Sequence, residues 1–273
     1  MPTSALLLAL AAAFVHALWN VLLARARDPR AATAVALLTA EVVFAIPAWA
    51  AWRMEPEVWP FLVASGALQL VYFALLVSAY RVAPLSVVYP ISRGVAPVLV
   101  LLLGVAVLGH ATSVGQVLGV LLVAAGVLLV RGLRPSAGRG VVLGLVIACV
   151  IATYTLVDKR GVTYAGALPY LELSMLGPAI AYAVFALRVR GGHALRSELR
   201  APTLVAGVAT FGAYCLVLLA LQRAPAAPVA AVRETSVVVT ALLAARYLAE
   251  PVRWPRFAGA AAVAGGIALL SLT

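Results

Sequence analysis

Charged residues are scarce in this sequence: only 11% of its 273 residues are Asp, Glu, Lys or Arg, and lysine occurs once, at Lys159. A soluble domain carries about 25% charged residues and roughly 45–50% apolar ones. Here the apolar share is 65% and the mean hydropathy is +1.09. An aqueous fold of this size cannot bury so much apolar surface, so we predict an integral membrane protein with the lipid bilayer as its solvent.

Other absences narrow the function. The net charge is +11, but no block of basic residues occurs, so we expect no nucleic-acid partner. The two cysteines, Cys149 and Cys215, lie in separate apolar runs and form neither a disulfide framework nor a metal-ligand spacing. No cofactor or metal is expected. The sequence contains no GxxxxGK[ST] motif, so ATP hydrolysis within the chain is not expected.

An intramembrane enzyme acting on a lipid-linked substrate is the alternative from another class. Such a site needs a cluster of catalytic groups, but His110 and His193 stand in different predicted loops. Asp158, beside Lys159, is interpreted as an isolated pair at the membrane interface. No nucleophile–base spacing emerges, and we predict that the protein is not an enzyme.

The apolar runs are long enough to be membrane-spanning helices, which need roughly 20 residues each. No basic residue precedes the first run, so it is interpreted as a retained helix rather than a signal peptide. No alternating pattern indicates a barrel. The fold class predicted is an all-α membrane protein with ten helices, at residues 4–24, 31–52, 59–80, 84–108, 113–131, 139–157, 167–187, 202–222, 226–248 and 255–272.

The two halves of the chain, 1–133 and 139–273, repeat one five-helix pattern. Glu41 and Glu172 are each followed six residues later by a proline. The stretch APLSVVYPISRGV corresponds to APAAPVAAVRETS, which aligns Arg93 with Glu234. Pseudo-symmetry allows these two residues to lie near each other across the repeat axis. Because five is odd, the second copy must cross the membrane in the opposite sense. This predicts two inverted repeats, an architecture of many secondary transporters.

Basic residues are concentrated in the loops after the odd-numbered helices. By the positive-inside rule that side is cytoplasmic, which leaves both termini on the non-cytoplasmic side of a cell (inner) membrane. These loops contain Arg25, Arg27, Arg30, Arg81, Arg131, Arg134, Arg139, Arg188, Arg190, Arg196, Arg200, Arg246, Arg253 and Arg256, whereas the opposite loops contain Arg53, Lys159, Arg160 and Arg223.

Arg93 and Arg233 lie within apolar helices, where a charge costs roughly 2.5–3.5 kcal/mol on insertion scales. Pro90 and Pro97 flank Arg93 and predict a bent or locally unwound helix that lines a midplane substrate site. The alternative for Arg93 is a structural pair between helices. Arg233 and Glu234 are adjacent, so on a helix they point about 100° apart and are not expected to pair with each other.

Further polar residues are candidates for the same site. Glu41 and Glu172 are candidate proton carriers, with hydrogen bonding to a neighbouring helix as the equal alternative. Packing inside the bundle is the alternative role for the remaining candidates. These are His16, Trp19 and Asn20 in the motif HALWN, together with Tyr72, Tyr89 and Tyr154. Gly115, Gly119, Gly259, Gly265 and Gly266 are predicted to bring helices together.

The repeated order of HALWN, YPISRGVAP and VRETSVV, with the glycine-rich runs VGQVLGVLLVAAGVLLV and RFAGAAAVAGGIALL, resembles the EamA branch of the drug/metabolite transporter superfamily. The resemblance covers essentially the whole chain. It implies a central cavity lined by helices 1, 3, 4, 6, 8 and 9, with helices 5 and 10 at the periphery. It also implies export or exchange of amino acids, metabolites or drugs.

We therefore predict a secondary transporter of a small metabolite, an amino acid or an organic anion, that works by alternating access and mediates efflux or exchange. Arg93 and Arg233 would attract an anionic group, and Glu234 could meet an amino group. A passive facilitator is the alternative within transport. Whether the protein forms a homodimer is left open.

Overall fold

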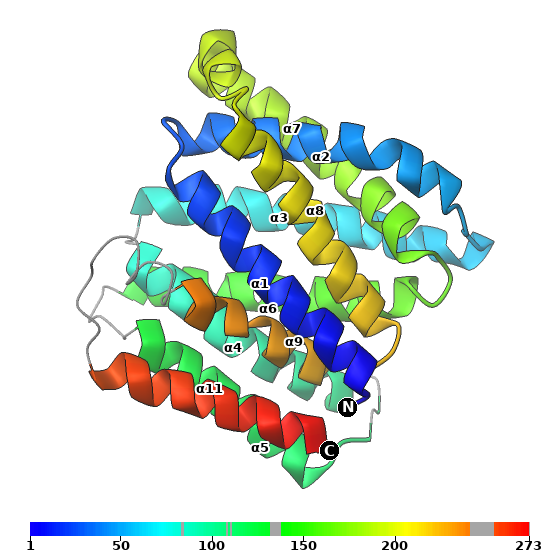
Figure 1. Ribbon diagram of the computed structural model, residues 1–273, viewed down its shortest axis with the longest axis vertical. Coiled ribbons are helices and arrows are strands. Elements are labelled where there is room, and N and C mark those ends of the chain that lie inside the picture. The colour runs from blue at the N-terminus through cyan, green and yellow to red at the C-terminus, as the bar shows by residue number, and fades with distance from the viewer. Residues whose placement is uncertain (83–84, 108, 110, 132–137, 241–253, 273) are drawn as a thin grey trace.

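The computed structural model describes residues 1–82, 85–107, 109, 111–131, 138–240 and 254–272. Over these residues the chain is helical and no strand occurs (Figure 1). The helices are α1 (Thr3–Ala24), α2 (Pro29–Ala50), η1 (Pro56–Val58, a 3₁₀ turn), α3 (Trp59–Val82), α4 (Leu85–Ala106), α5 (Val114–Arg131), α6 (Gly138–Gly161), α7 (Ala167–Ser197), α8 (Ala201–Leu221), α9 (Ala226–Arg233) and α11 (Trp254–Leu272).

Among the described residues, seven helices are long and apolar enough to cross a membrane, and parts of α5 and α11 form shorter apolar helices. The helices begin and end close to the predicted positions, except for the seventh and the ninth. The seventh was predicted to end at residue 187, but α7 continues to Ser197. Gly191 interrupts it with a φ of 78°, a conformation that only glycine adopts without strain, so the last residues form a separate turn of helix.

The helix break predicted near Arg93 lies elsewhere. The α-helix α4 runs continuously through Pro90 and Pro97, so the prediction of local unwinding was wrong. The break occurs at the pseudo-equivalent Glu234, where α9 ends. There the Glu234 amide donates a hydrogen bond to the carbonyl oxygen of Ala231, and the Val237 amide donates one to that of Glu234. Both bonds join residues three apart, as in a 3₁₀ turn. Helical conformation resumes at residue 235. Residues 241–248 of the ninth predicted helix lie outside the described residues.

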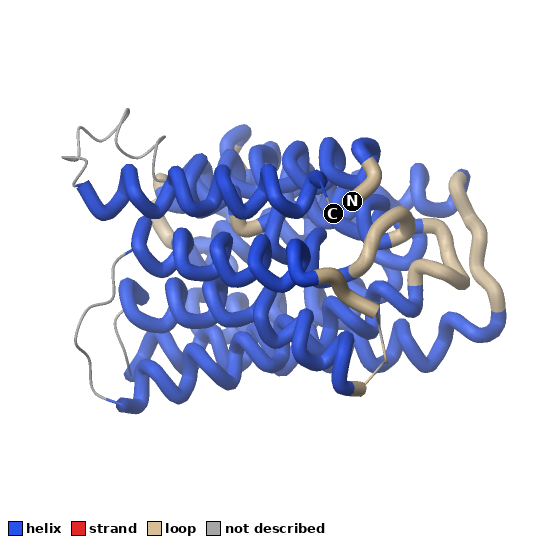
Figure 2. The backbone as a smooth tube through the Cα atoms, turned by 90° about the horizontal axis from the view of Figure 1, so that it is seen from below, coloured by secondary structure: helices blue, strands red, loops and turns tan. Residues whose placement is uncertain are grey.

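The two halves of the chain are interleaved. Helices α1 and α8, α2 and α7, α3 and α6, α4 and α6, and α5 and α11 pack as pairs, and each pair joins the first half to the second. Figure 2 shows the helices side by side with their connections at the two ends of the bundle. Most helix packing therefore crosses between the halves, and neither half forms a core of its own.

Two glycine contacts define the symmetry of this arrangement. A Cβ atom on Gly119 would lie 3.1 Å from the carbonyl oxygen of Gly266, and one on Gly126 would lie 2.7 Å from that of Gly259. The residue number rises along α5 while that of its partner falls along α11, so the two helices are antiparallel. Since Gly119 corresponds to Gly259 and Gly126 to Gly266 in the repeat, the two contacts are related by a local two-fold axis. Glycine permits this close approach, as predicted.

The ends of the chain meet. The amino group of Met1 donates a hydrogen bond to the carbonyl oxygen of Leu270 at 3.3 Å, and Figure 1 shows the two termini beside each other. Elsewhere, the turn after α6 is joined to the turn after α2 through a bridge between Met54 and Ala165. Both cysteines are free.

Candidate functional site

A cavity of about 760 Å³ lies between the two halves of the bundle. This volume falls within the range of about 300–1,000 Å³ typical of small-molecule sites. Its described lining comes from α1, α3, α4, α6, α8 and α9, and also from α2 and α7, which the resemblance had not implied. No described residue of α5 or α11 contributes. The predicted site residues that line it are His16, Trp19, Asn20, Tyr72, Tyr89, Arg93, Tyr154 and Arg233.

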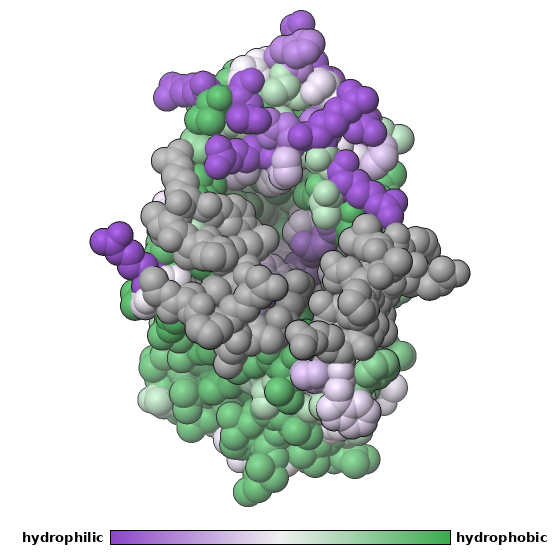
Figure 3. Space-filling view, turned by 90° about the vertical axis from the view of Figure 1, so that its left-hand side faces the viewer, coloured by the Kyte–Doolittle hydropathy of each residue, from purple (hydrophilic) through white to green (hydrophobic). Residues whose placement is uncertain are grey.

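The cavity reaches the molecular surface at the end of the bundle that carries the turn between α1 and α2. Ala24, Asp28, Arg30 and Arg190 belong to its lining at this end. Figure 3 views the corresponding face, which is hollowed at its centre below a group of hydrophilic side chains. The lining at this end is charged, whereas the lining deeper in the molecule is mostly aromatic and aliphatic.

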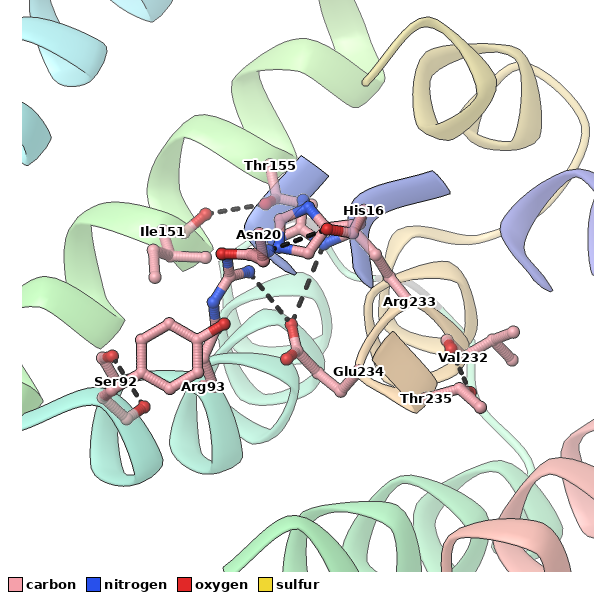
Figure 4. A network of polar contacts seen from close by, with 11 residues as sticks. His16, Asn20, Ser92, Arg93, Ile151, Thr155, Val232, Arg233, Glu234 and Thr235 are labelled. Carbon is pink, nitrogen blue, oxygen red and sulfur yellow. Dashed lines mark hydrogen bonds and ion pairs between the residues drawn. The ribbon is translucent and has the colours of Figure 1, made fainter. Parts of the chain in front are cut away.

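Three charged side chains meet at the centre of the molecule. The Nη1 atom of Arg93 on α4 lies 3.3 Å from Oε1 of Glu234, and the Nε atom of Arg233 lies 3.8 Å from the same oxygen (Figure 4). All three side chains are at most 8% exposed. The expectation that Arg233 and Glu234 would not pair was wrong, because the long side chain of Arg233 brings its Nε atom to the carboxylate of its neighbour.

This cluster differs in part from the predicted substrate contacts. Arg93 and Arg233 line the cavity, but Glu234 does not and is only 2% exposed. Its carboxylate is directed to the two guanidinium groups. The sequence correspondence between Arg93 and Glu234 therefore describes a real contact across the local two-fold axis, and α4 and α9 are the elements that bring it together.

His16 connects α1 to the cluster. The Nη2 atom of Arg93 lies 3.3 Å from Nε2 of His16. Arginine has no acceptor, so this contact requires a neutral imidazole with its proton on Nδ1. Asn20, one turn further along α1, donates to the carbonyl oxygen of His16 at 2.8 Å, and Figure 4 shows both side chains beside Arg93. The motif HALWN thus contributes polar groups to one wall.

Aromatic rings form much of the remaining wall. Tyr154 on α6 makes edge contacts with Tyr72 and Tyr214, with ring centroids 6.3 Å and 6.4 Å apart. The guanidinium of Arg93 lies over the Tyr89 ring, 5.5 Å from its centroid. Trp19 packs edge-on against His16 at 4.8 Å. These contacts hold the rings at the cavity surface, where they offer apolar area with polar edges.

Some buried polar atoms of the site make no hydrogen bond in the described part of the chain. They include Nε of Arg233 and Nε1 of Trp19, which are donors on cavity-lining residues, and Oε2 of Glu234. Unsatisfied buried donors are costly, at about 1–3 kcal/mol each. These two donors, on residues that line the cavity, are therefore candidates for hydrogen bonds to the acceptor atoms of a ligand.

Glu41 and Glu172 lie outside this cavity. Their carboxyl groups face each other where α2 packs against α7 and are close enough to interact. Both oxygens of Glu41 and Oε2 of Glu172 accept no hydrogen bond from any residue that the structure describes. The sequence correspondence again describes a contact across the two-fold axis, and the proton-carrying role of the pair stays a prediction.

Sequence reasoning missed Asp158. It does not form the predicted interfacial pair with Lys159, because the Lys159 ammonium donates to the carbonyl oxygens of Leu221 and Ala224 (3.0 Å for the latter). Asp158 is fully buried and accepts hydrogen bonds from two tyrosines. Its position in the last turn of an apolar helix could have indicated burial, but its neighbour Lys159 suggested a surface location.

Asp28 caps α2 at the cavity entrance. Its side chain accepts from the amides of Arg30 and Ala31, and Arg190 on α7 donates to its other oxygen. Glu198 accepts from the Asp28 amide at 2.9 Å. Burial acts to raise the pKa of Asp28. The hydrogen bonds from Arg190 and from the two backbone amides outweigh this effect and lower the pKa below its ordinary value. This cluster joins the α1–α2 turn to α7 and α8.

Comparison with known proteins agrees with this architecture. The model of the EamA-like transporter family matches the chain twice, at residues 3–132 and 138–272. A solved structure described only as "Crystal structure of protein" is similar over 100% of this chain and 98% of its own, with a TM-score of 0.79 and 18% identity, which shows a shared fold. No curated protein matches the sequence.

Proposed function

We propose that this chain, which belongs to the EamA-like transporter family, is a secondary transporter that carries a small organic anion by alternating access. It is a multi-pass membrane protein. Ten helices in two inverted five-helix repeats would surround the central cavity, and rocking of the repeats would expose it to each side in turn. The observation that carries the proposal is the cavity of about 760 Å³ with Arg93 and Arg233 in its wall.

The charge balance of the site favours an anion. Two guanidinium groups face one carboxylate, so the cluster of Arg93, Arg233 and Glu234 retains one positive charge. The Arg233 guanidinium and the Trp19 indole N–H, both on residues of the cavity wall, suit the oxygens of a carboxylate or a phosphate-like group. The surrounding aromatic and aliphatic residues suit an apolar body.

A zwitterionic amino acid fits less well. Its ammonium group needs an acceptor or an anion, but Glu234 does not line the cavity and is already shared by two arginines. A phenol edge or the face of an aromatic ring would have to replace it. An organic anion without an amino group is therefore the better match, and amino acids serve as the comparison in the test.

The orientation follows from the arginine-rich turns. The cavity is open at the end that carries Asp28, Arg30 and Arg190, which the positive-inside rule assigns to the cytoplasm. The structure would then represent the inward-open form, with both termini on the outer side of a cell membrane. An inward-open cavity suits loading from the cytoplasm, and this supports efflux or exchange as the direction.

The test is counterflow in proteoliposomes loaded with single monocarboxylates, dicarboxylates or amino acids. We expect carboxylates to exchange and Arg233→Gln to reduce their apparent affinity roughly 10- to 100-fold, because a hydrogen bond to a charged group contributes about 1.5–3 kcal/mol. Arg223→Gln removes an exposed arginine outside the cavity and is the matched control. Equal transport of every accepted compound by wild type and Arg233→Gln would contradict the assignment.

A passive facilitator is the competing function within transport, and the same vesicles distinguish the two. A coupled transporter concentrates its substrate when an ion gradient is imposed, whereas a facilitator only equilibrates it. Concentration above the equilibrium level under a proton or sodium gradient would favour coupled transport.

A further inference from the structure

The buried carboxylate of Asp158 stands in the last turn of α6, behind the cavity wall. Asp158 has no exposed surface. The hydroxyl of Tyr170 on α7 donates to its Oδ1 at 2.9 Å, and the hydroxyl of Tyr214 on α8 donates to its Oδ2. The buried hydroxyl of Ser65 on α3 faces the same carboxylate and makes no hydrogen bond to another group among the described residues. Three helices thus direct hydroxyl groups at one acid.

No cation in the described part of the chain forms an ion pair with Asp158. The adjacent Lys159 is directed to the carbonyl oxygens of Leu221 and Ala224. Arg233 on α9 acts on the carboxylate only at longer range. Burial without a counter-charge disfavours the ionised acid, whereas the two phenol donors stabilise it. These opposing effects allow Asp158 to exist in either protonation state.

Asp158 is connected to the cavity through one side chain. Tyr214 lines the cavity and its hydroxyl donates a hydrogen bond to Asp158, so one side chain contacts both the cavity and the acid. Tyr154, one turn earlier on α6, lines the cavity beside it. The phenol of Tyr214 is therefore a one-step path for a proton between cavity water and Asp158.

The repeat shows that this cluster is not required by the fold. Aligning Trp19 with Tyr154 places Leu23 opposite Asp158. Aligning Gly66 with Gly207 places Phe73 opposite Tyr214 and Ala206 opposite Ser65. Both Phe73 and Tyr214 line the cavity, so the alignment holds in space.

The corresponding position in the first repeat is therefore occupied by leucine and phenylalanine, and Thr39 stands opposite Tyr170 when Glu41 is aligned with Glu172. The positions that correspond to Asp158 and Tyr214 therefore carry no ionisable group at the open end of the cavity. The acid and its two tyrosines lie at the opposite end. Packing alone therefore does not explain why Asp158 and its tyrosines occur at this end of the cavity.

We propose that Asp158 is a proton-binding site whose occupancy is coupled to the opening of the closed end of the cavity. The inference rests on the transport function proposed above and supplies its coupling ion. A proton reaches the phenolic oxygen of Tyr214 from cavity water while the proton of Tyr214 moves to Oδ2 of Asp158. The net change is one carboxylate and one proton converted to one carboxylic acid.

Opening of the closed end of the cavity would expose Asp158 to the water on that side of the membrane. With the α6–α8 contact separated, Asp158 loses the hydrogen bond from Tyr214 and meets water, to which it exchanges its proton. The groups that face it are Tyr170, Tyr214, Ser65 and Arg233, and none of them is a carboxylate or an imidazole. Asp158 is thus the titrating group of this cluster.

The test is infrared spectroscopy of the purified full chain, titrated from about pH 5 to about pH 9, the interval in which carboxyl groups shifted by burial ionise. We expect one carboxylic C=O stretching component to disappear with rising pH and to be absent in Asp158→Asn. Glu41→Gln and Glu172→Gln, which alter the other intramembrane pair, should retain it. Tyr214→Phe removes one hydroxyl without changing the ring, and should shift the frequency and midpoint of the same component.

The proposal is overturned if Asp158→Asn and wild type show identical titrations, or if the component does not change in Tyr214→Phe. Should Asp158→Asn not fold, the Tyr214→Phe and Tyr170→Phe spectra still decide. The spectra need no substrate, so their outcome is independent of transport. A titrating Asp158 in a protein that moves no solute would contradict the transport function and leave the site intact.

Discussion

At the scale of single residues, Glu234 is the one carboxylate that two guanidinium groups share in the buried centre of the molecule. Removing one partner of a buried ion pair costs about 3–5 kcal/mol because the other charge is left unpaired. We expect Glu234→Gln to lower the melting temperature strongly, and Arg93→Gln/Glu234→Gln to recover part of the loss. A double-mutant cycle in detergent measures this coupling, and additive losses would show that the two side chains do not interact.

Glu41 and Glu172 give the opposite expectation. Two facing carboxyl groups without hydrogen-bond donors are unfavourable neighbours, and an amide supplies a donor. Glu41→Gln should therefore retain or raise the melting temperature near neutral pH. A proton-carrying role predicts, in addition, altered pH dependence of transport in this variant. A large loss of stability would indicate instead that Glu41 makes an essential bond.

The site residues could be predicted from the sequence where a charged residue stands within an apolar run. Arg93, Arg233 and Glu234 were found because a charge within an apolar run needs a partner, and the repeat correctly placed Arg93 near Glu234. Asp158 was missed because its neighbour Lys159 implied a surface position. Only the fold shows that the two side chains point to different partners.

At the scale of elements, the start of α2 depends on Asp28, which both caps the helix and pairs with Arg190. Asparagine caps as well as aspartate does, so Asp28→Asn isolates the charge. We expect it to cost about 0.5–1 kcal/mol, because Arg190 is 44% exposed and solvent screens the pair. Asp28→Ala should lose a further 0.5–2 kcal/mol or so with the cap.

The difference between wild type and Asp28→Asn should depend on pH. The pKa of Asp28 is lower in the folded state than in the unfolded chain, so its contribution is fully present above about pH 4 and is lost as pH falls through the folded-state pKa. Melting curves of both proteins should therefore converge in acid. A constant difference across the titration would contradict the charge pairing.

Close contact between α5 and α11 depends on glycine. A Cβ atom on Gly126 would lie 2.7 Å from both the Gly259 oxygen and a Val263 methyl group, whereas one on Gly212 in α8 would meet nothing within 4 Å. Gly126→Ala should lower the melting temperature by the equivalent of about 1–3 kcal/mol of overpacking. Gly212→Ala, the matched control, should retain or raise it. Equal effects would mean that the contact between α5 and α11 adjusts freely.

Helix positions were largely predictable because hydrophobic length alone defines a span. The failures are local and have local causes. The prolines of α4 were overvalued as helix breakers, while the break at Glu234 and the continuation of α7 to Ser197 depend on backbone bonds and on Gly191. Hydropathy carries no information about either.

At the scale of the whole molecule, Lys159 stabilises the closed end of the cavity, because its ammonium group connects α6 to the end of α8 and the turn that follows. We expect Lys159→Met to shift the population toward opening at that end. The measurement is labelling of Val162→Cys, in a background without native cysteines, by a membrane-impermeant maleimide. Val162 is 1% exposed, so its labelling should be slow alone and faster with Lys159→Met.

Arg160→Met removes an exposed cation from the same turn and is the control for this experiment. Unchanged labelling in Lys159→Met would show that other contacts keep the closed end shut. The inverted arrangement itself was predictable from the repeat, but the inequality of its two ends was not. It arises from side chains such as Lys159 and Asp158, which have no counterpart in the first half.

The contact between Arg93 and Glu234 also has a consequence for biogenesis, since 141 residues separate the two partners. At about 5–20 residues per second, the ribosome needs roughly 7–28 s to make the carboxylate after the guanidinium has emerged. During that interval the nascent first half has neither its counter-ion nor most of its neighbouring helices. The insertion machinery or a chaperone must therefore shelter an unpaired cation until synthesis of the second half is nearly complete.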